Sequence, residues 1–123
     1  MGTDKRNSVV EITSEENAAV VAFKSASISN MEEIAVASGQ IKEFIEAKKP
    51  KEVVVDFENV KFFSSAVLGL LLDIRAKLKT YDAEVVISSI NPQLYRVFKI
   101  THLDRIFKFF PDKADAIRAV NAG

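Results

Sequence analysis

Short apolar runs alternate along the chain with longer segments in which apolar residues recur every three or four positions. The first two runs, Val9–Thr13 and Ala18–Phe23, are rich in β-branched residues and are separated by the polar segment Ser14–Asn17. Runs of this length on either side of a polar turn are typical of a β-hairpin. The sequence therefore predicts an N-terminal hairpin.

A helix is predicted directly after the hairpin. Ser29 and Asn30 precede Glu32 and Glu33 at the spacing of a capping box. The apolar positions that follow form one helical face: Ile34, Ala37, Ile41, Phe44 and Ile45. Pro50 ends this segment, since proline cannot continue a helix.

A buried strand and a second helix come next. Val53–Val55 with Phe57 is a continuous apolar run, which is typical of a strand covered on both faces of a parallel sheet. Ala66–Thr80 reads as a helix whose inward positions are Val67, Leu70, Leu71, Ile74 and Leu78. Glu84–Ser88 is a further buried strand.

The last third of the chain predicts two more helices and a short edge strand. Asn91 and Pro92 form a strong helix start, with a capping side chain before a proline. Ile106–Phe109 is assigned as the edge strand and Asp112–Val120 as the final helix. The inward residues of the third helix are Leu94, Val97 and Phe98. We therefore expect one α/β domain, with a mixed, mostly parallel sheet of four to five strands, an N-terminal hairpin, right-handed crossovers and about four helices.

Composition and charge narrow the classes of function. The 123 residues fit one domain, and 17 basic residues balance 17 acidic residues. A neutral protein gains little long-range attraction to nucleic acid or to an anionic membrane, so neither is expected as a partner. The polar segment Met1–Asn7 is assigned as a disordered leader, and residues 8–121 as the domain. No apolar run is long enough for a membrane span, and we expect a cytoplasmic protein.

The residues needed for common catalytic and cofactor sites are missing. The chain has no cysteine, and His102 is its only histidine, so thiolate chemistry and multi-histidine metal sites are excluded. The four glycines form neither a phosphate-binding loop nor a dinucleotide fingerprint. We expect no enzyme activity, no metal and no cofactor.

The segment between Phe57 and Ala66 stands out because loops beyond the carboxyl ends of central strands often carry function in open α/β sheets. It ends in Phe62, Phe63, Ser64 and Ser65. One interpretation is structural: a serine simply caps the following helix. The other is regulatory: a phosphoserine at a helix N-terminus meets unpaired N–H donors, while its charge spoils an apolar docking surface. The local sequence leaves both open.

The same segment resembles the STAS domains of anti-sigma factor antagonists. In these, a buried strand ends in Asp, a short segment follows, and an Asp-Ser-Ser/Thr-Gly-Leu-Gly turn then opens a helix. Here the strand is Val53–Phe57 and the turn is Ser64–Gly69. A second stretch, Ser89–Phe107, resembles the family's third helix and the short strand after it, including the Leu-Asp-x-Ile-Phe ending. The resemblance implies a single STAS-type domain.

Carried over position by position, the resemblance implies that Ser65 is the phosphoacceptor, with Ser64 as the alternative. The partner-binding residues that it implies are Phe63, Ser64, Ser65, Ala66, Val67 and Asn91. Two positions depart from the family pattern: Ser64 replaces Asp, and Val67 replaces Gly. The second change is expected to add an apolar side chain to the surface that a partner would meet.

The function that this resemblance implies is that of an anti-sigma factor antagonist. It would bind an anti-sigma factor with serine kinase activity, release the sigma factor, and be switched by phosphorylation and by a phosphatase. One alternative is a STAS module that acts as a phosphorylation-independent scaffold in a signalling assembly. Another is a STAS domain that binds a small ligand, a nucleotide or a lipid.

Overall fold

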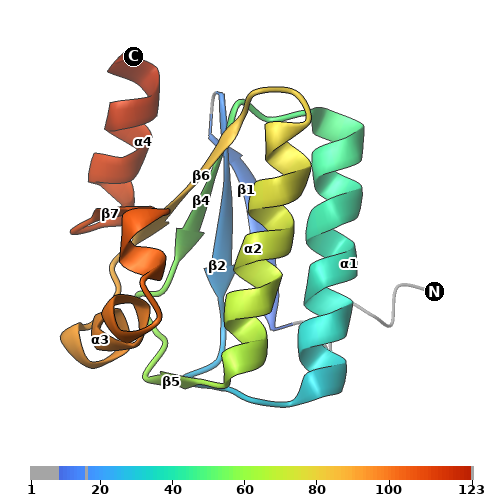
Figure 1. Cartoon of the computed structure of the whole chain (residues 1–123). Helices are drawn as coiled ribbons and strands as arrows, with labels where there is room; N and C mark the ends of the chain where they lie inside the picture. The colour runs from blue at the N-terminus through green and yellow to red at the C-terminus, as the bar shows by residue number, and fades with distance from the viewer. Residues whose placement is uncertain (1–8, 16, 123) are drawn as a thin grey trace.

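A five-stranded sheet forms the centre of the computed structural model, which describes residues 9–15 and 17–122. The strands follow the order β1-β2-β4-β6-β7 across the sheet (Figure 1). Only the hairpin pair β1–β2 is antiparallel, and the other three neighbouring pairs are parallel. Their bounds are β1 Val10–Glu15, β2 Ala18–Phe23, β4 Glu52–Asp56, β6 Glu84–Ser88 and β7 Lys108–Phe110. The predicted mixed, mostly parallel sheet is confirmed.

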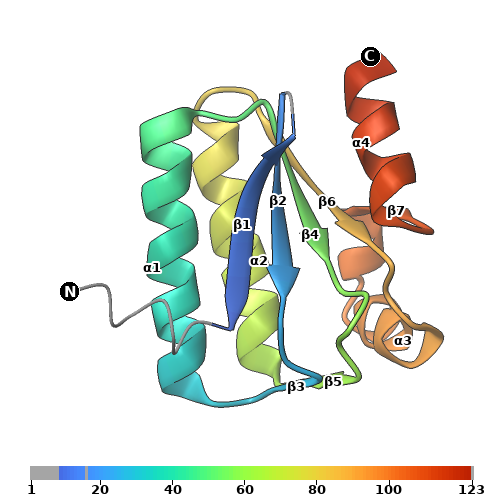
Figure 2. The ribbon, with the colours of Figure 1, turned by 180° about the vertical axis from the view of Figure 1, so that it is seen from behind.

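Helices cover the sheet from both sides. α1 (Met31–Lys48) and α2 (Ser65–Lys79) lie side by side and run in the same direction, while α4 (Lys113–Ala122) lies beyond β7 on the other side of the molecule (Figures 1 and 2). α3 (Pro92–Ile100) sits at the end of the sheet where α2 begins (Figure 1). A large core joins the sheet to α1 and α2, and a smaller one joins it to α4.

Strand burial follows from the period of two of the β-strand. Val53, Val54 and Val55 of β4 are all buried, because alternate side chains point into the two opposite cores. Asp56, at the carboxyl end of β4, is also buried, although its side chain is polar. Its buried carboxylate accepts a hydrogen bond from the Ser88 hydroxyl at 2.9 Å, which offsets the cost of burying it.

Local signals determine where α1 begins and ends. The Asn30 side chain caps α1 by accepting a hydrogen bond from the N–H of Glu33 at 3.0 Å. Lys49 adopts a left-handed conformation with φ 47°, and its N–H donates to the carbonyl of Ile45 at 2.8 Å. Pro50 follows, so the predicted boundaries of this helix are confirmed.

Some boundaries differ from the prediction. β1 continues to Glu15, because Ser14 and Glu15 pair with Ala19 and Ala18, so the polar turn is shorter than expected. The edge strand begins at Lys108 rather than Ile106, since a turn of 3-10 helix, η2 (Leu103–Arg105), precedes it. The expected leader, residues 1–7, lies outside the described residues. No helix in the described part of the chain is long and apolar enough to cross a membrane.

A second, two-stranded sheet was not predicted. β3 (Ser27–Ile28) and β5 (Phe62–Phe63) pair in parallel beyond the carboxyl ends of β2 and β4 (Figure 2). Two-residue strands are too short to show alternation, and this pair joins segments far apart in the sequence. This small sheet carries the turn that leads into α2.

Candidate functional site at the start of α2

The segment that connects β4 to α2 is tied to its surroundings through its backbone. The N–H of Phe57 donates to the carbonyl of Ser88 at 2.9 Å. Further on, the N–H groups of Lys61 and Phe62 both donate to the carbonyl of Ala26, at 2.7 and 3.1 Å. The connection is therefore an ordered platform built on β6 and on the segment after β2.

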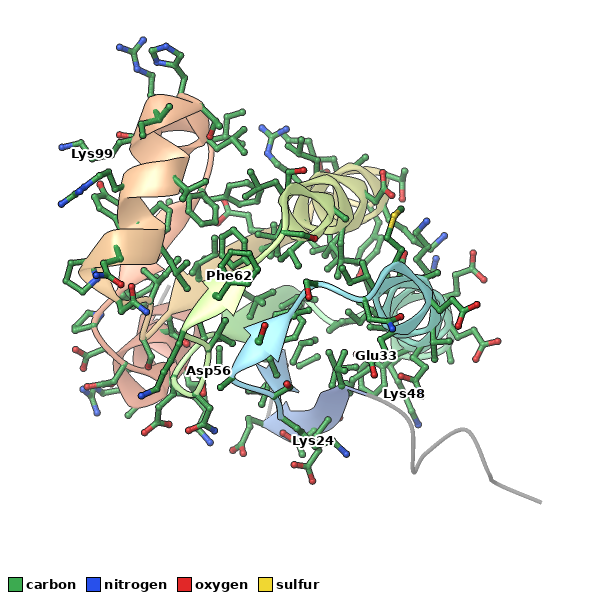
Figure 3. The ribbon with its side chains drawn as sticks, turned by 90° about the horizontal axis from the view of Figure 1, so that it is seen from below. Lys24, Glu33, Lys48, Asp56, Phe62 and Lys99 are labelled. Carbon is green, nitrogen blue, oxygen red and sulfur yellow. The ribbon has the colours of Figure 1, made fainter. Side chains whose placement is uncertain are left out.

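Aromatic packing supports this platform from below. Phe63 is only 6% exposed and meets Phe57 and Phe98 edge to face, with ring centroids 5.7 and 6.1 Å apart. Phe98 in turn packs against Phe109 at 5.2 Å. Phe62 points the other way because successive strand residues alternate, and it is 53% exposed between α2 and α3 (Figure 3).

Asn91 connects the platform to α3. Its amide nitrogen donates to the carbonyl of Val60 at 3.2 Å, and its side-chain oxygen accepts from the N–H of Leu94 at 2.8 Å. The predicted cap is confirmed, with Pro92 at the first helical position. Both ends of the side chain are engaged within the protein, so Asn91 acts here as a positioning residue for the turn.

Ser64 occupies the N-cap position of α2 without capping it. Its N–H donates to the carbonyl of Ile28 at 2.9 Å, and its backbone is extended, with φ −83° and ψ 166°. The hydroxyl makes no capping bond, in contrast to the side chains of Asn30 and Asn91. Within the described residues, it is the buried side-chain polar atom without a hydrogen-bond partner. The start of α2 therefore lacks the side-chain acceptor that usually satisfies it.

Ser65 is the first residue of α2, and it is exposed. The positive end of the helix dipole lies at this position, and the first turn of α2 contains no acidic residue. A phosphate on the Ser65 hydroxyl would meet favourable backbone dipoles and no carboxylate of that turn. The site can accept an added negative charge without disturbing the core beneath it.

The structure corrects two of the residues predicted to face a partner. Val67 is fully buried, because it continues the inward stripe of α2 with Leu71 and Ile74. Phe63 is likewise buried, in the aromatic row that it forms with Phe57, Phe98 and Phe109. The prediction that Val67 faces the core is therefore confirmed, and the prediction that its side chain lies on the surface is wrong. Of the other predicted residues, Ser65 is exposed and Ala66 is partly buried.

The exposed residues near Ser65 include some that were not predicted to bind a partner. Gly69 and Leu72 lie four and seven residues further along α2, on the same helical face, and both are exposed. With the exposed ring of Phe62 they give the surface near Ser65 an apolar character. The helical spacing from Ser65 was the available signal for the first two. The exposure of Phe62 follows from the pairing of β3 with β5, for which the sequence gives no local signal.

A different polar cluster lies at the opposite end of the sheet. Glu52 and Glu84 begin β4 and β6 and are direct neighbours in the register. Burial and the nearby Glu84 carboxylate raise the pKa of Glu52 to about 7, although Lys108 opposes this shift. Lys108 forms an ion pair with Glu84 at 3.7 Å. Among the described residues, no group of three or more His, Cys, Asp or Glu side chains is arranged to hold a metal ion.

The family of this chain is shown by comparison with known proteins. The model of the STAS domain matches residues 9–116, and the chain belongs to this family. A STAS-domain containing protein of Pseudomonas aeruginosa is 27% identical over 59 residues, which are 48% of this chain and 58% of that protein. The match thus spans little more than half the length of that relative.

Solved structures agree with the family assignment at the level of the fold. An anti-sigma factor antagonist (STAS) domain protein from Planctomyces limnophilus is 22% identical, with a TM-score of 0.82 over 89% of this chain and 96% of that chain. The anti-sigma factor antagonist SpoIIAA in its unphosphorylated form is 16% identical, with a TM-score of 0.81 over 93% of this chain and 97% of that chain. The phosphorylated form of SpoIIAA from Bacillus is 18% identical, with a TM-score of 0.72 over 90% of this chain and 98% of that chain.

Proposed function

We propose that this STAS domain is an anti-sigma factor antagonist that binds its anti-sigma factor through the surface around Ser65. The observation that carries the proposal is the exposed Ser65 at the uncapped N-terminus of α2. The exposed apolar side chains of Phe62, in β5, and of Leu72, two helical turns further along α2, accompany it. The partner would be an anti-sigma factor with serine kinase activity. The domain itself would act as its substrate and not as an enzyme.

Phosphorylation of Ser65 would switch this binding off. The added charge of about −1.5 to −2 would be tolerated by the helix N-terminus but would have to lose water against an apolar partner surface. SpoIIAA, which shares the fold, exists in phosphorylated and unphosphorylated forms. The buried hydroxyl of Ser64 favours Ser65 over Ser64 as the acceptor. A phosphatase would restore the binding form.

The direct test combines phosphate mapping with binding measurements. The chain is incubated with ATP and candidate anti-sigma factor kinases from the same genome, and any phosphate is located by mass spectrometry. We expect phosphate on Ser65 and none on a Ser65→Ala variant. Ser65→Asp should lower partner affinity by more than about tenfold, or 1.4 kcal/mol, with an unchanged fold.

Ser14→Asp is the matched control, because Ser14 is an exposed serine on β1 at the amino end of the parallel strands, opposite the start of α2. It should bind the partner like the wild type. Undiminished phosphorylation of Ser65→Ala would overturn the assignment of the acceptor. Wild-type affinity of Ser65→Asp would instead favour the phosphorylation-independent scaffold, which the replacement of the family's Asp by Ser64 also supports.

A further inference from the structure

The outer face of α3 carries positive charge that the protein itself leaves unpaired. Arg96 and Lys99 on α3 and Arg105 in η2 are all exposed. The salt bridges among the described residues involve none of the three. In Figure 3, Lys99 points outward on the side of α3 that faces away from Phe62 and α2. This basic face is separate from the surface around Ser65.

The same face also exposes a groove with both apolar and basic lining residues. Ile100, the last residue of α3, is 71% exposed, although a side chain of this kind favours burial. It borders an open groove of about 410 Å3, lined by Pro92, Tyr95, Arg96, Lys99 and Ile100. The ring of Tyr95 is held edge to face by Phe109, with centroids 4.9 Å apart, so this wall of the groove is supported from the core.

Charge is distributed unevenly along the chain, although the net charge is zero. Residues 61–123 contain ten basic and six acidic side chains, whereas residues 1–60 contain seven basic and eleven acidic ones. The segment 91–107, which forms α3 and η2, contributes three Arg and Lys residues against one carboxylate, that of Asp104. The segment that forms α3 and η2 therefore carries two of the four net positive charges of the second half.

We propose that the outer face of α3 is a second docking surface, which binds an acidic segment of a protein partner. The segment would place an apolar side chain against Ile100 and Tyr95. Carboxylates on either side of that side chain would pair with Arg96 and Lys99. Opposite charge at the rim and apolar contact at the centre is the arrangement that gives protein interfaces their specificity and their affinity.

The mixed character of the face favours a protein over other anionic partners. Nucleic acid binds mainly through its phosphates, which would leave Ile100 in water, and the neutral net charge gives little long-range attraction to it. Recognition of anionic lipid usually requires a cluster of about four to eight Lys and Arg residues, more than this face offers. An acidic peptide with an apolar residue uses both features of the groove.

The test is a titration of the isotopically labelled full chain with a defined probe, followed by NMR. The probe is a short synthetic peptide in which leucines are flanked by glutamates. We expect amide shifts concentrated in residues 92–107. Arg96→Glu combined with Lys99→Glu should raise the Kd by more than about tenfold. Ile100→Ser should raise it by about fivefold, since part of the apolar contact is lost.

The controls separate this surface from the one around Ser65. Lys48→Glu combined with Lys79→Glu reverses two exposed lysines at the far ends of α1 and α2, and should leave the Kd unchanged. Ser65→Asp should also bind the peptide normally, so the failure of one proposal does not decide the other. A peptide with serine in place of leucine should bind at least about fivefold more weakly.

Three results would overturn the proposal. The first is an absence of shifts in α3 at millimolar peptide, and the second is an unchanged Kd for the double charge reversal. The third is equal binding, through the same amides, of single-stranded DNA or of vesicles containing phosphatidylserine. This last result would define a general anion surface in place of a site for an acidic protein segment.

Discussion

The two ends of the parallel sheet use polar residues in different ways. At the carboxyl end, Ser64 and Ser65 begin α2 without a side-chain cap, and apolar side chains such as Phe62 are exposed beside them. At the amino end, Glu52 and Glu84 lie side by side, and the ion pair of Glu84 with Lys108 balances only part of their charge. One end leaves a helix start without a side-chain cap, and the other brings carboxylates together.

This difference separates a binding role from a role in stability. The helix start can receive a ligand or a modification from outside, because no side chain of the protein caps it. The carboxylates at the amino end interact chiefly with each other and with Lys108, so their protonation changes the stability of the fold. We expect mutations at the two ends to differ accordingly.

The largest effect is expected in β5, at the carboxyl end. Phe63→Ala removes a buried ring from the aromatic row and should lower the free energy of unfolding by about 3–5 kcal/mol. Phe62→Ala, one residue earlier and half exposed, should cost less than about 1 kcal/mol. Urea unfolding monitored by circular dichroism measures both. Equal costs would mean that the platform does not depend on the aromatic row.

The two N-cap positions at this end, Ser64 and Asn91, provide a sharper test. Asn91→Ala should cost about 1–2 kcal/mol, because it removes the cap of α3 and the hydrogen bond to Val60. Ser64→Ala should change the stability by less than about 0.5 kcal/mol, since its hydroxyl makes no hydrogen bond. Thermal unfolding distinguishes the two variants. A cost for Ser64→Ala similar to that for Asn91→Ala would contradict the uncapped start of α2.

At the amino end of the sheet we expect a smaller effect on the free energy of unfolding, and one that depends on pH. In the folded state the pKa of Glu52 is about 7, above its ordinary value of 4.5, so the folded protein binds more protons between these values. The free energy of unfolding should therefore fall as the pH rises from about 4.5 to 8. Because Glu52 is only partly buried, solvent screening limits the loss to about 1 kcal/mol.

Glu52→Gln should remove this pH dependence and make the variant more stable than the wild type at pH 8 and above. Glu46→Gln is the control. The hydrogen bond and charge of Lys77, 2.6 Å from Glu46, lower the pKa of that carboxyl, so it titrates at lower pH. Chemical unfolding across the pH range compares the variants. A wild-type slope retained by Glu52→Gln would show that Glu52 is not the group responsible.

Much of the fold could be predicted from the sequence because its signals are local. The strand β6 and the helix starts at Asn30 and Asn91 follow from apolar periodicity and from capping side chains within a few residues. The turn that carries Ser65 was located in the same way, since a helical pattern follows a buried strand after a short polar segment. Such signals do not depend on the rest of the chain.

The properties of the site were decided by contacts between distant segments. The pairing of β3 with β5 orients Phe62 outward and Phe63 inward, and the packing of α2 on the sheet buries Val67. Contacts between distant segments also set the register that places Glu52 beside Glu84. The sequence by itself determined the main helices, the strands of the large sheet and the position of the serine turn. Tertiary structure decided which side chains a partner can reach, because burial and pairing depend on neighbours that the local pattern does not contain.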